Sequence, residues 1–125
     1  MIKPNNLANK NFLSILDLST EDVLHLLELA RSFKNKDLNL KFKDKVLGLI
    51  FDKSSTRTRV SFQVAMTRLG GTTIDLNPTT SQIGRGEPIK DTARVLSSYC
   101  DVIAIRTFDH ADLEEYAKWS TKPVI

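Results

Sequence analysis

Residues 54–59 combine hydroxyl and guanidinium side chains in a pattern that suits phosphate binding, because their sequence is SSTRTR and a helix is expected to begin inside it. The first N–H groups of a helix have no partner within the helix and carry the positive end of its dipole, so they attract anions. The hydroxyls of Ser55, Thr56 and Thr58 would lie beside these N–H groups. Arg57 adds a planar fork of donors that fits two phosphate oxygens. We therefore predict a dianion site, the alternative being a capping run with surface arginines.

A second arginine is expected at the same place in the fold. Arg106 directly follows an apolar run at 102–105, and residues 46–51 form a similar run shortly before the turn. If both runs are parallel strands of one sheet, their carboxyl ends meet at one edge, and Arg106 brings a second positive charge to the anion. The alternative for Arg106 is an ordinary ion pair with Asp101 or Asp109, which would contribute little to stability.

Two common nucleotide-binding signatures are missing from the sequence. No G-x-x-x-x-G-K-[ST] string occurs, which excludes a Walker-type phosphate loop. The segment Gly84-Arg85-Gly86 is not a dinucleotide fingerprint, because Ile89 stands where the third glycine would be and no strand leads directly into it. A smaller phosphorylated ligand is therefore the interpretation that fits the turn.

The apolar pattern alternates between short runs of strand length and longer stretches with helical spacing, which predicts an α/β fold. Four strands are expected, at 46–51, 72–76, 102–105 and, as the start of a fourth, 123–125. Helices are expected after Ser19, from the turn to Leu69, from Pro88 to Tyr99, and from Leu113 to Trp119. Right-handed crossovers then give a single domain with a doubly wound, parallel, four-stranded sheet flanked by helices. The first and third strands should flank the point where the strand order reverses.

The expected helices also indicate how they should pack. The first helix has an apolar face at residues 23, 26, 27, 30 and 33, so this face should cover something apolar. The second should end at Gly70, because glycine adopts the left-handed backbone conformation at little cost. The inner face of the third is expected to consist of Ile89, Ala93 and Leu96.

Composition narrows the class of protein. The 125 residues are 41% hydrophobic and 26% charged, which suits one domain with a single core. The net charge of +3 is compatible with an anionic ligand, but the basic residues are scattered, so nucleic acid is not an expected partner. No apolar run has the length of a signal peptide or membrane span, which predicts a cytoplasmic protein without membrane contact. The single cysteine, Cys100, excludes an internal disulfide and is expected to be a buried structural thiol.

Several strings taken together resemble the aspartate/ornithine carbamoyltransferase family. They are STRTR followed by Ser61-Phe62, the turn Leu69-Gly70-Gly71, QIGRGE at 82–87 with Asp91-Thr92, Ile105-Arg106-Thr107, and KPVI at 122–125. Their order and spacing agree with the family over nearly the whole chain. Aspartate enzymes usually carry a lysine in the polar loop and Lys-Gly-Glu where this sequence has Arg85-Gly86-Glu87, so Gln82 favours the ornithine branch. By itself Gln82 would be interpreted as a surface loop residue.

The resemblance implies a function for residues 1–125 as a carbamoyl-phosphate-binding domain. It implies that Ser55, Thr56, Arg57 and Thr58 hold the phosphate of carbamoyl phosphate, that Arg57 and Arg106 reach the carbamoyl oxygen, and that Gln82 comes from a neighbouring subunit of a homotrimer. Thr58 and Arg106 would be the catalytic donors that stabilise the charge on that oxygen while the δ-amino group of L-ornithine attacks, giving L-citrulline and phosphate for arginine biosynthesis. No metal and no cofactor are implied.

The sequence also departs from the family in ways that leave alternatives open. The family continues past Pro-Val-Ile-Asn to a His-Pro-x-Gln string and to a second domain that binds the amino acid, so L-ornithine is expected as a partner only with that missing second domain, and the isolated chain is expected to be inactive. Asp52 and Gln63 stand where many relatives have glutamate. The alternatives are a fragment of an aspartate-type or other amine carbamoyltransferase, and a stand-alone phosphate-binding module with flavodoxin-like architecture.

Overall fold

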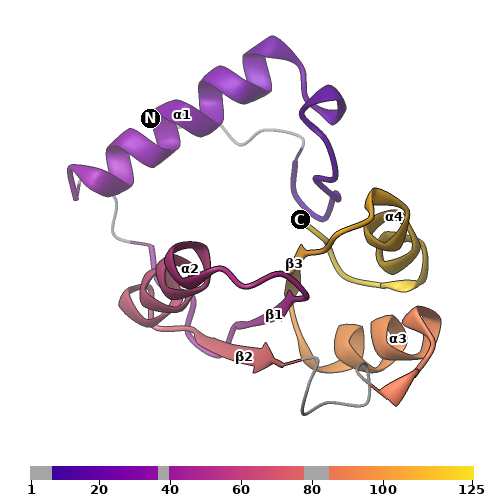
Figure 1. The fold of residues 1–125 in the computed structure, drawn as a ribbon. Helices are drawn as coiled ribbons and strands as arrows, with labels where there is room; N and C mark the ends of the chain where they lie inside the picture. The colour runs from indigo at the N-terminus through magenta and orange to yellow at the C-terminus, as the bar shows by residue number, and fades with distance from the viewer. Residues whose placement is uncertain (1–6, 37–39, 78–84) are drawn as a thin grey trace.

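A computed structural model describes residues 7–36, 40–77 and 85–125, and Figure 1 shows how their helices and strands are arranged. In chain order these are η1 (Ile15–Asp17), α1 (Thr20–Lys34), β1 (Val46–Phe51), α2 (Thr56–Arg68), β2 (Thr72–Leu76), α3 (Ile89–Tyr99), β3 (Val102–Arg106) and α4 (His110–Trp119). The alternation of strands and helices confirms the predicted α/β class. None of the helices in these ranges has the length and apolar character needed to cross a membrane.

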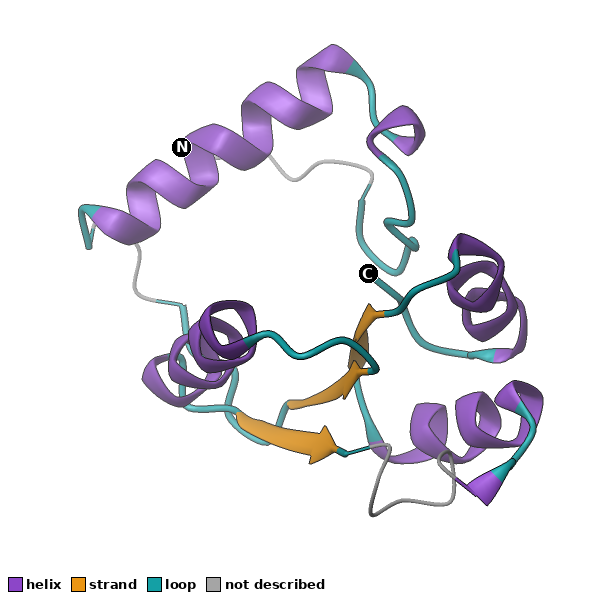
Figure 2. Cartoon of the chain, in the orientation of Figure 1, coloured by secondary structure: helices purple, strands orange, loops and turns teal. Residues whose placement is uncertain are grey.

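The strands form a parallel sheet in the order β2-β1-β3, with β1 in the centre (Figure 2). Five of the six residues of β1 are buried, as expected for a strand covered on both faces. The chain passes from β1 to β2 on one side and then crosses to β3 on the other. The strand order therefore reverses between β1 and β3, where the sequence predicted it.

The prediction of a fourth strand at 123–125 is wrong. Within the described residues the sheet has three strands, and this segment contributes one isolated parallel bridge between Ile103 and Val124. The Ile103 N–H donates to the Pro123 carbonyl at 3.0 Å, and the Ile125 N–H donates to the Ile103 carbonyl at 2.9 Å. Pairing cannot extend toward residue 122, because Pro123 has no N–H to donate to β3. Val124 is nevertheless fully buried, so the segment contributes to the core.

Helices cover the two faces of the sheet unequally. α3 and α4 lie on one face and α2 on the other (Figure 1). The core on the α3 and α4 side contains, among others, Ile50, Ala93, Leu96, Ile103, Tyr116 and Val124. The core on the α2 side contains Leu47, Leu49, Phe51 and Ala104, with Phe62 and Met66 packed against it. The predicted inner face of α3 is confirmed, since Ala93 and Leu96 are buried and Ile89 packs against them.

Local chemistry explains three of the helix ends. Ser19 and Asp22 form a reciprocal capping box at the start of α1. Gly70 has φ +82°, which confirms the left-handed glycine that was predicted to end α2. α4 begins at His110, three residues before the predicted start at Leu113, because the Asp109 carboxylate accepts a hydrogen bond from the Ala111 N–H at 3.0 Å.

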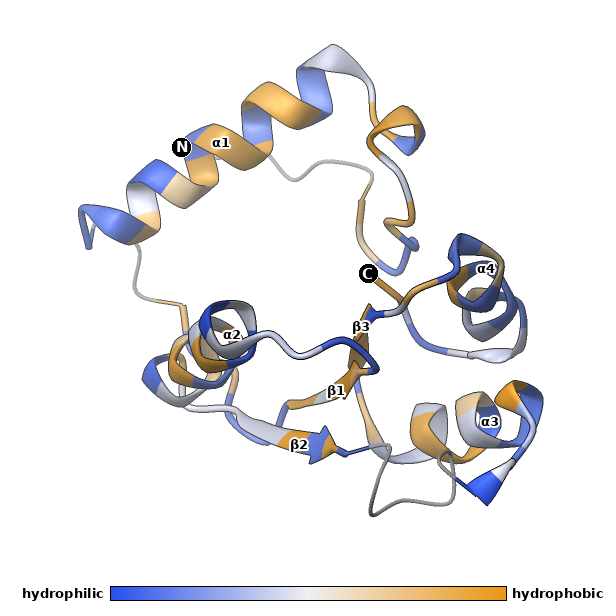
Figure 3. Ribbon diagram, in the orientation of Figure 1, coloured by the Kyte–Doolittle hydropathy of each residue, from blue (hydrophilic) through white to orange (hydrophobic). Residues whose placement is uncertain are grey.

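The apolar face of α1 does not cover a core in the described part of the chain, contrary to the prediction. No residue of α1 is buried, and Leu27 keeps 62% of its surface exposed. Figure 3 shows hydrophobic residues along α1, which lies apart from α2 and the sheet. Helical spacing of apolar residues shows that a helix has an apolar stripe, but it does not show what lies against that stripe.

Cys100 is buried, as predicted. Burial raises the pKa of its thiol, and the neighbouring Asp101 carboxylate adds to this shift, so the reactive thiolate is disfavoured. The Cys100 sulfur also lies so close to the backbone of β1 that a Cβ atom at Gly48 would stand 3.0 Å from it. The glycine in the middle of β1 therefore allows this close approach.

Asp101 joins the amino ends of β1 and β3. Its carboxylate accepts the Val46 N–H at 2.8 Å, its own N–H donates to the Val46 carbonyl at 2.8 Å, and Lys45 forms an ion pair with it at 3.5 Å. The hydrogen bond from Val46 lowers the pKa of Asp101 below its ordinary value of 3.8, and Lys45 acts in the same direction. Asp101 therefore stabilises the fold above about pH 4, and this contribution is lost as the pH falls through the lower pKa of the folded state.

We expect Asp101→Asn to reduce the acid sensitivity of the fold. The amide can still accept the Val46 N–H, but it cannot titrate or pair with Lys45. The free energy of unfolding should be lower for the variant at pH 7, and the difference from wild type should shrink as the pH is lowered from about 4. Urea unfolding followed by circular dichroism across this range measures the effect. A difference that stays constant with pH would exclude Asp101 as a source of the acid sensitivity.

Candidate functional site

The turn at residues 54–58 follows one strand and leads into one helix, as predicted. β1 ends at Phe51 and α2 begins at Thr56, so Thr56, Arg57 and Thr58 lie in the first turn of α2 and Ser55 directly precedes it. Ser55 is the N-cap, but its side chain makes no capping hydrogen bond, and the first turn contains no acidic residue. The Ser55 hydroxyl and the first N–H groups of α2 are thus not engaged by a side-chain cap, and the positive end of the dipole is not neutralised locally.

The exposure of the predicted residues is compatible with ligand binding. Thr56, Arg57 and Thr58 are exposed and Ser55 is half-buried. The only side-chain hydrogen bond to this turn in the described part of the chain comes from Ser61, whose hydroxyl donates to the Thr58 carbonyl at 2.8 Å. The guanidinium of Arg57 is therefore not held in an ion pair with any described residue, and it is available to an anion.

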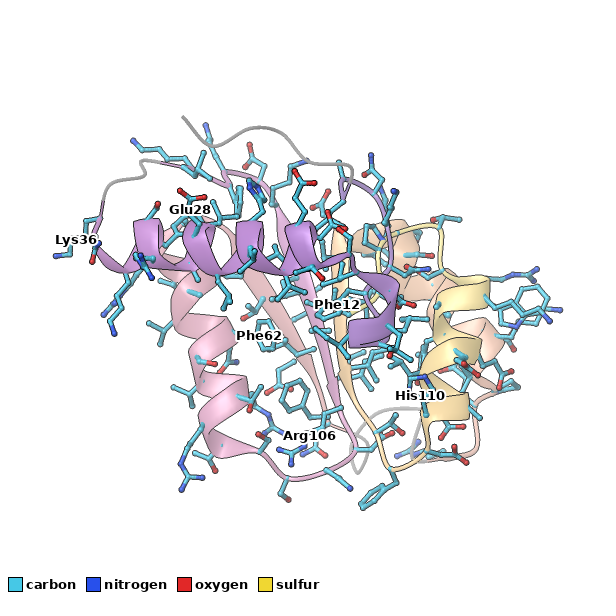
Figure 4. All side chains as sticks on the ribbon, turned by 90° about the horizontal axis from the view of Figure 1, so that it is seen from above. Phe12, Glu28, Lys36, Phe62, Arg106 and His110 are labelled. Carbon is cyan, nitrogen blue, oxygen red and sulfur yellow. The ribbon has the colours of Figure 1, made fainter. Side chains whose placement is uncertain are left out.

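Arg106 lies at the same edge of the sheet as this turn. It is the last residue of β3 and pairs in register with Phe51, the last residue of β1. Its carbonyl accepts a hydrogen bond from the Asp52 N–H at 2.8 Å, which fixes the first residue of the loop beside it. Figure 4 shows Arg106 next to the loop that joins β1 to α2. The structure thus brings Arg106 and the 54–58 turn to one edge.

The alternative ion pairs of Arg106 are not formed. Asp101 pairs with Lys45 instead, and Asp109 caps α4. Arg106 is exposed, and among the residues that the structure describes no carboxylate lies within ion-pair distance of it. Two uncompensated guanidinium groups, from Arg57 and Arg106, are thus carried by neighbouring segments at one edge, which favours an anion there.

Gln82 lies outside the described residues, so its predicted place in the site stays a prediction. Glu87, five residues later, is described, and the Thr92 hydroxyl donates to its carboxylate at 2.8 Å. This bond joins the end of the polar loop to the first turn of α3.

Sequence reasoning missed one contact at this edge. The ammonium of Lys53 lies 4.8 Å from the ring centroid of Phe108, which is a cation–π contact between the loop after β1 and the loop after β3. Lys53 follows the first predicted strand by two positions and Phe108 follows the third by three, and this placement is the signal that could have revealed them.

Tyr116 of α4 adds no charge near the site at neutral pH. Burial raises the pKa of its phenol to about 12, and the Asp52 carboxylate is the next contributor to the shift. Tyr116 therefore stays protonated over the whole range in which carboxylates and phosphates titrate.

Comparison with known proteins agrees with this arrangement. Residues 10–125 match the family model for the carbamoyl-P binding domain of aspartate/ornithine carbamoyltransferases. The chain belongs to this family. An ornithine carbamoyltransferase of Prochlorococcus marinus subsp. pastoris is 82% identical over all 125 residues, which are 41% of that protein. The chain thus spans about two fifths of the length of the carbamoyltransferases it matches.

Solved structures of the family share the fold. Ornithine carbamoyltransferase from Pyrococcus furiosus is 47% identical with a TM-score of 0.87, and the match covers 95% of this chain and 39% of that one. Aspartate transcarbamoylase from Trypanosoma cruzi, in complex with carbamoyl phosphate and aspartate, is 32% identical with a TM-score of 0.88, covering 99% of this chain and 40% of that one. The fold of this chain is therefore found in both the ornithine and the aspartate enzymes of the family.

Proposed function

We propose that this chain is the carbamoyl-phosphate-binding domain of an ornithine carbamoyltransferase. The observation that carries the proposal is the position of the uncapped, acid-free first turn of α2 beside Arg106 at the edge where the strand order reverses. The T. cruzi relative was solved with carbamoyl phosphate, which supports the choice of ligand. The higher identity to ornithine enzymes than to that aspartate enzyme supports ornithine as the acceptor.

The site has the donors that the transfer reaction needs. The N–H groups of the first turn of α2, the hydroxyls of Ser55, Thr56 and Thr58, and Arg57 would hold the phosphate. The amine lone pair of ornithine forms the new bond to the carbamoyl carbon, and negative charge grows on the carbamoyl oxygen, where Thr58 and Arg106 would stabilise it. The bond between that carbon and the phosphate oxygen then breaks, phosphate leaves with the electron pair, and the amine loses a proton. Citrulline and phosphate result.

The remaining parts of this function need more than the described residues. Ornithine binding would require a region beyond these 125 residues, in keeping with the longer relatives. A homotrimer would allow Gln82 of a neighbouring subunit to complete the carbamoyl phosphate site. Both statements are part of the proposal and rest on the family resemblance of the motifs.

Arg57→Ala is expected to weaken binding of carbamoyl phosphate and of inorganic phosphate to the 125-residue chain. Loss of a charge-assisted, bidentate contact should cost about 1.5 to 3 kcal/mol, which is roughly 10- to 150-fold in the dissociation constant. Isothermal titration calorimetry of both proteins measures this change, and added salt should weaken the wild type more steeply than the variant. The matched control is Arg68→Ala, since Arg68 lies at the opposite end of α2. Equal affinities for wild type and Arg57→Ala would reject Arg57 as a phosphate ligand.

A further inference from the structure

Arg59 lies in the same first turn of α2 as the predicted phosphate-binding residues, but its side chain is directed at the sheet. Its Nε lies 3.4 Å from a carboxylate oxygen of Asp75 on β2. Its guanidinium carbon lies 5.7 Å from the ring centroid of Phe51, the last residue of β1. Arg59 therefore contacts two strands at once, in contrast to the exposed Arg57 two residues earlier.

Asp75 is placed where the sheet faces α2. In the register of the parallel strands it pairs with Leu49, whose side chain belongs to the core on the α2 side. Partners in register point to the same face of a sheet, so the Asp75 side chain, which keeps 28% of its surface exposed, lies on the face that α2 covers. A charge in such a position is unfavourable unless a partner compensates it, and Arg59 is the cation that does so.

Arg59 combines an ion pair to Asp75 with a cation–π contact to Phe51. The Nε atom of Arg59 is buried and has no hydrogen-bond partner among the described residues, so its N–H is not aimed at the Asp75 oxygen despite the short distance. The planar guanidinium also makes a cation–π contact with Phe51, which is separate from its attraction to the Asp75 charge. Phe51 is itself fixed by Phe62 of α2, whose ring packs edge-on at a centroid distance of 6.5 Å.

We propose that Arg59 and Asp75 position the first turn of α2 so that the N–H groups and hydroxyls of residues 55–58 face the ligand. This inference rests on the proposed function of that turn. The backbone N–H of Arg59 donates to the backbone carbonyl of Ser55 at 3.3 Å, which is the first hydrogen bond of α2. Holding the Arg59 side chain against β2 therefore holds the N-cap residue as well. Arg59 is a positioning residue in this account, and it does not contact the phosphate.

Asp75→Asn separates this role from a direct electrostatic one. Removing a negative charge near an anion site strengthens anion binding by Coulomb's law if Asp75 only modulates the field, or if it withholds Arg59 from the ligand. If the pair positions the turn, the same substitution weakens binding. We expect the affinity of the 125-residue chain for inorganic phosphate to fall about threefold to tenfold, measured by calorimetry at low ionic strength.

Two further variants make the comparison sharp. Asp75→Glu keeps the charge and should restore most of the affinity. Asp44→Asn removes a carboxylate from a turn before β1, where φ is +62° and asparagine is tolerated, so it should leave phosphate binding unchanged. Affinity that is unchanged or increased in Asp75→Asn, with Asp44→Asn at the wild-type level, would overturn the positioning role.

Amide hydrogen exchange tests the same pair without a ligand. Asp75→Asn should speed exchange at the Arg59 and Val60 amides, which form the first hydrogen bonds of α2, while amides of β1 keep their wild-type rates. If wild type does not bind phosphate, the proposed function fails and exchange alone decides the positioning role. Unchanged exchange at both amides would then reject it.

Discussion

The 125-residue chain alone is expected to form no measurable citrulline from ornithine and carbamoyl phosphate. Orienting two reactants can lower a barrier by about 7 to 11 kcal/mol, and this contribution requires a site for the amine as well as for the carbamoyl group. The chain spans 41% of the P. marinus relative. A chimera in which residues 1–125 are followed by the rest of that relative should therefore be active. A colorimetric assay for citrulline on both proteins measures the difference.

Arg106→Ala in the chimera tests the role of the arginine at the end of β3. Loss of one donor to the developing oxyanion should lower kcat about 100- to 1000-fold. Arg68→Ala is the matched control, since it removes an exposed arginine from the far end of α2. Citrulline formation by the short chain would refute the need for a second domain, and full activity of the Arg106→Ala chimera would remove Arg106 from the mechanism. Faster turnover of aspartate than of ornithine would point to the aspartate branch.

Leu49→Ala is expected to cause a large loss of stability. Leu49 is completely buried in the centre of β1, on the face that α2 covers. Truncation to alanine removes the transfer free energy of the side chain and leaves a cavity, so the free energy of unfolding should fall by about 2 to 5 kcal/mol. Urea denaturation followed by circular dichroism measures this change.

Leu27→Ala provides the matched comparison. Leu27 lies on α1 and is 62% exposed, so the same chemical truncation should change the free energy of unfolding by less than about 0.5 kcal/mol. A loss at Leu27 as large as that at Leu49 would show that α1 is packed against other groups in solution. A small effect at both positions would contradict the central place of β1 in the core.

The sequence predicted best those features that local chemistry determines. β1 is covered on both faces, so its six residues form an unbroken apolar run whose limits the structure reproduces. Gly70 was recognisable because a helix end needs a left-handed residue. The arrival of Arg106 beside the 54–58 turn followed from the rule that parallel strands end at one edge. The ligand contacts of these residues stay a prediction.

The features that were missed depend on contacts between distant elements. In β2 Asp75 lies on the face of the sheet that α2 covers, an orientation that was not predicted from the sequence. Arg59 lies over that strand and compensates the Asp75 charge, and no local sequence pattern indicates this contact. The same limit explains α1, because an apolar stripe gives no information about its partner.

The pairing of β1 with β3 also has a consequence for folding kinetics. The hydrogen bond between Val46 and Asp101 joins residues 55 positions apart, so this pairing must close a long loop, at an entropic cost of about 3 to 4 kcal/mol. The first turn of α2 can form locally and early, whereas Arg106 reaches it only when the crossover through β2 and α3 is complete. Phosphate would then bind at full strength only to chains that have finished this step. The anion would act as a ligand of the native topology and not of a folding intermediate.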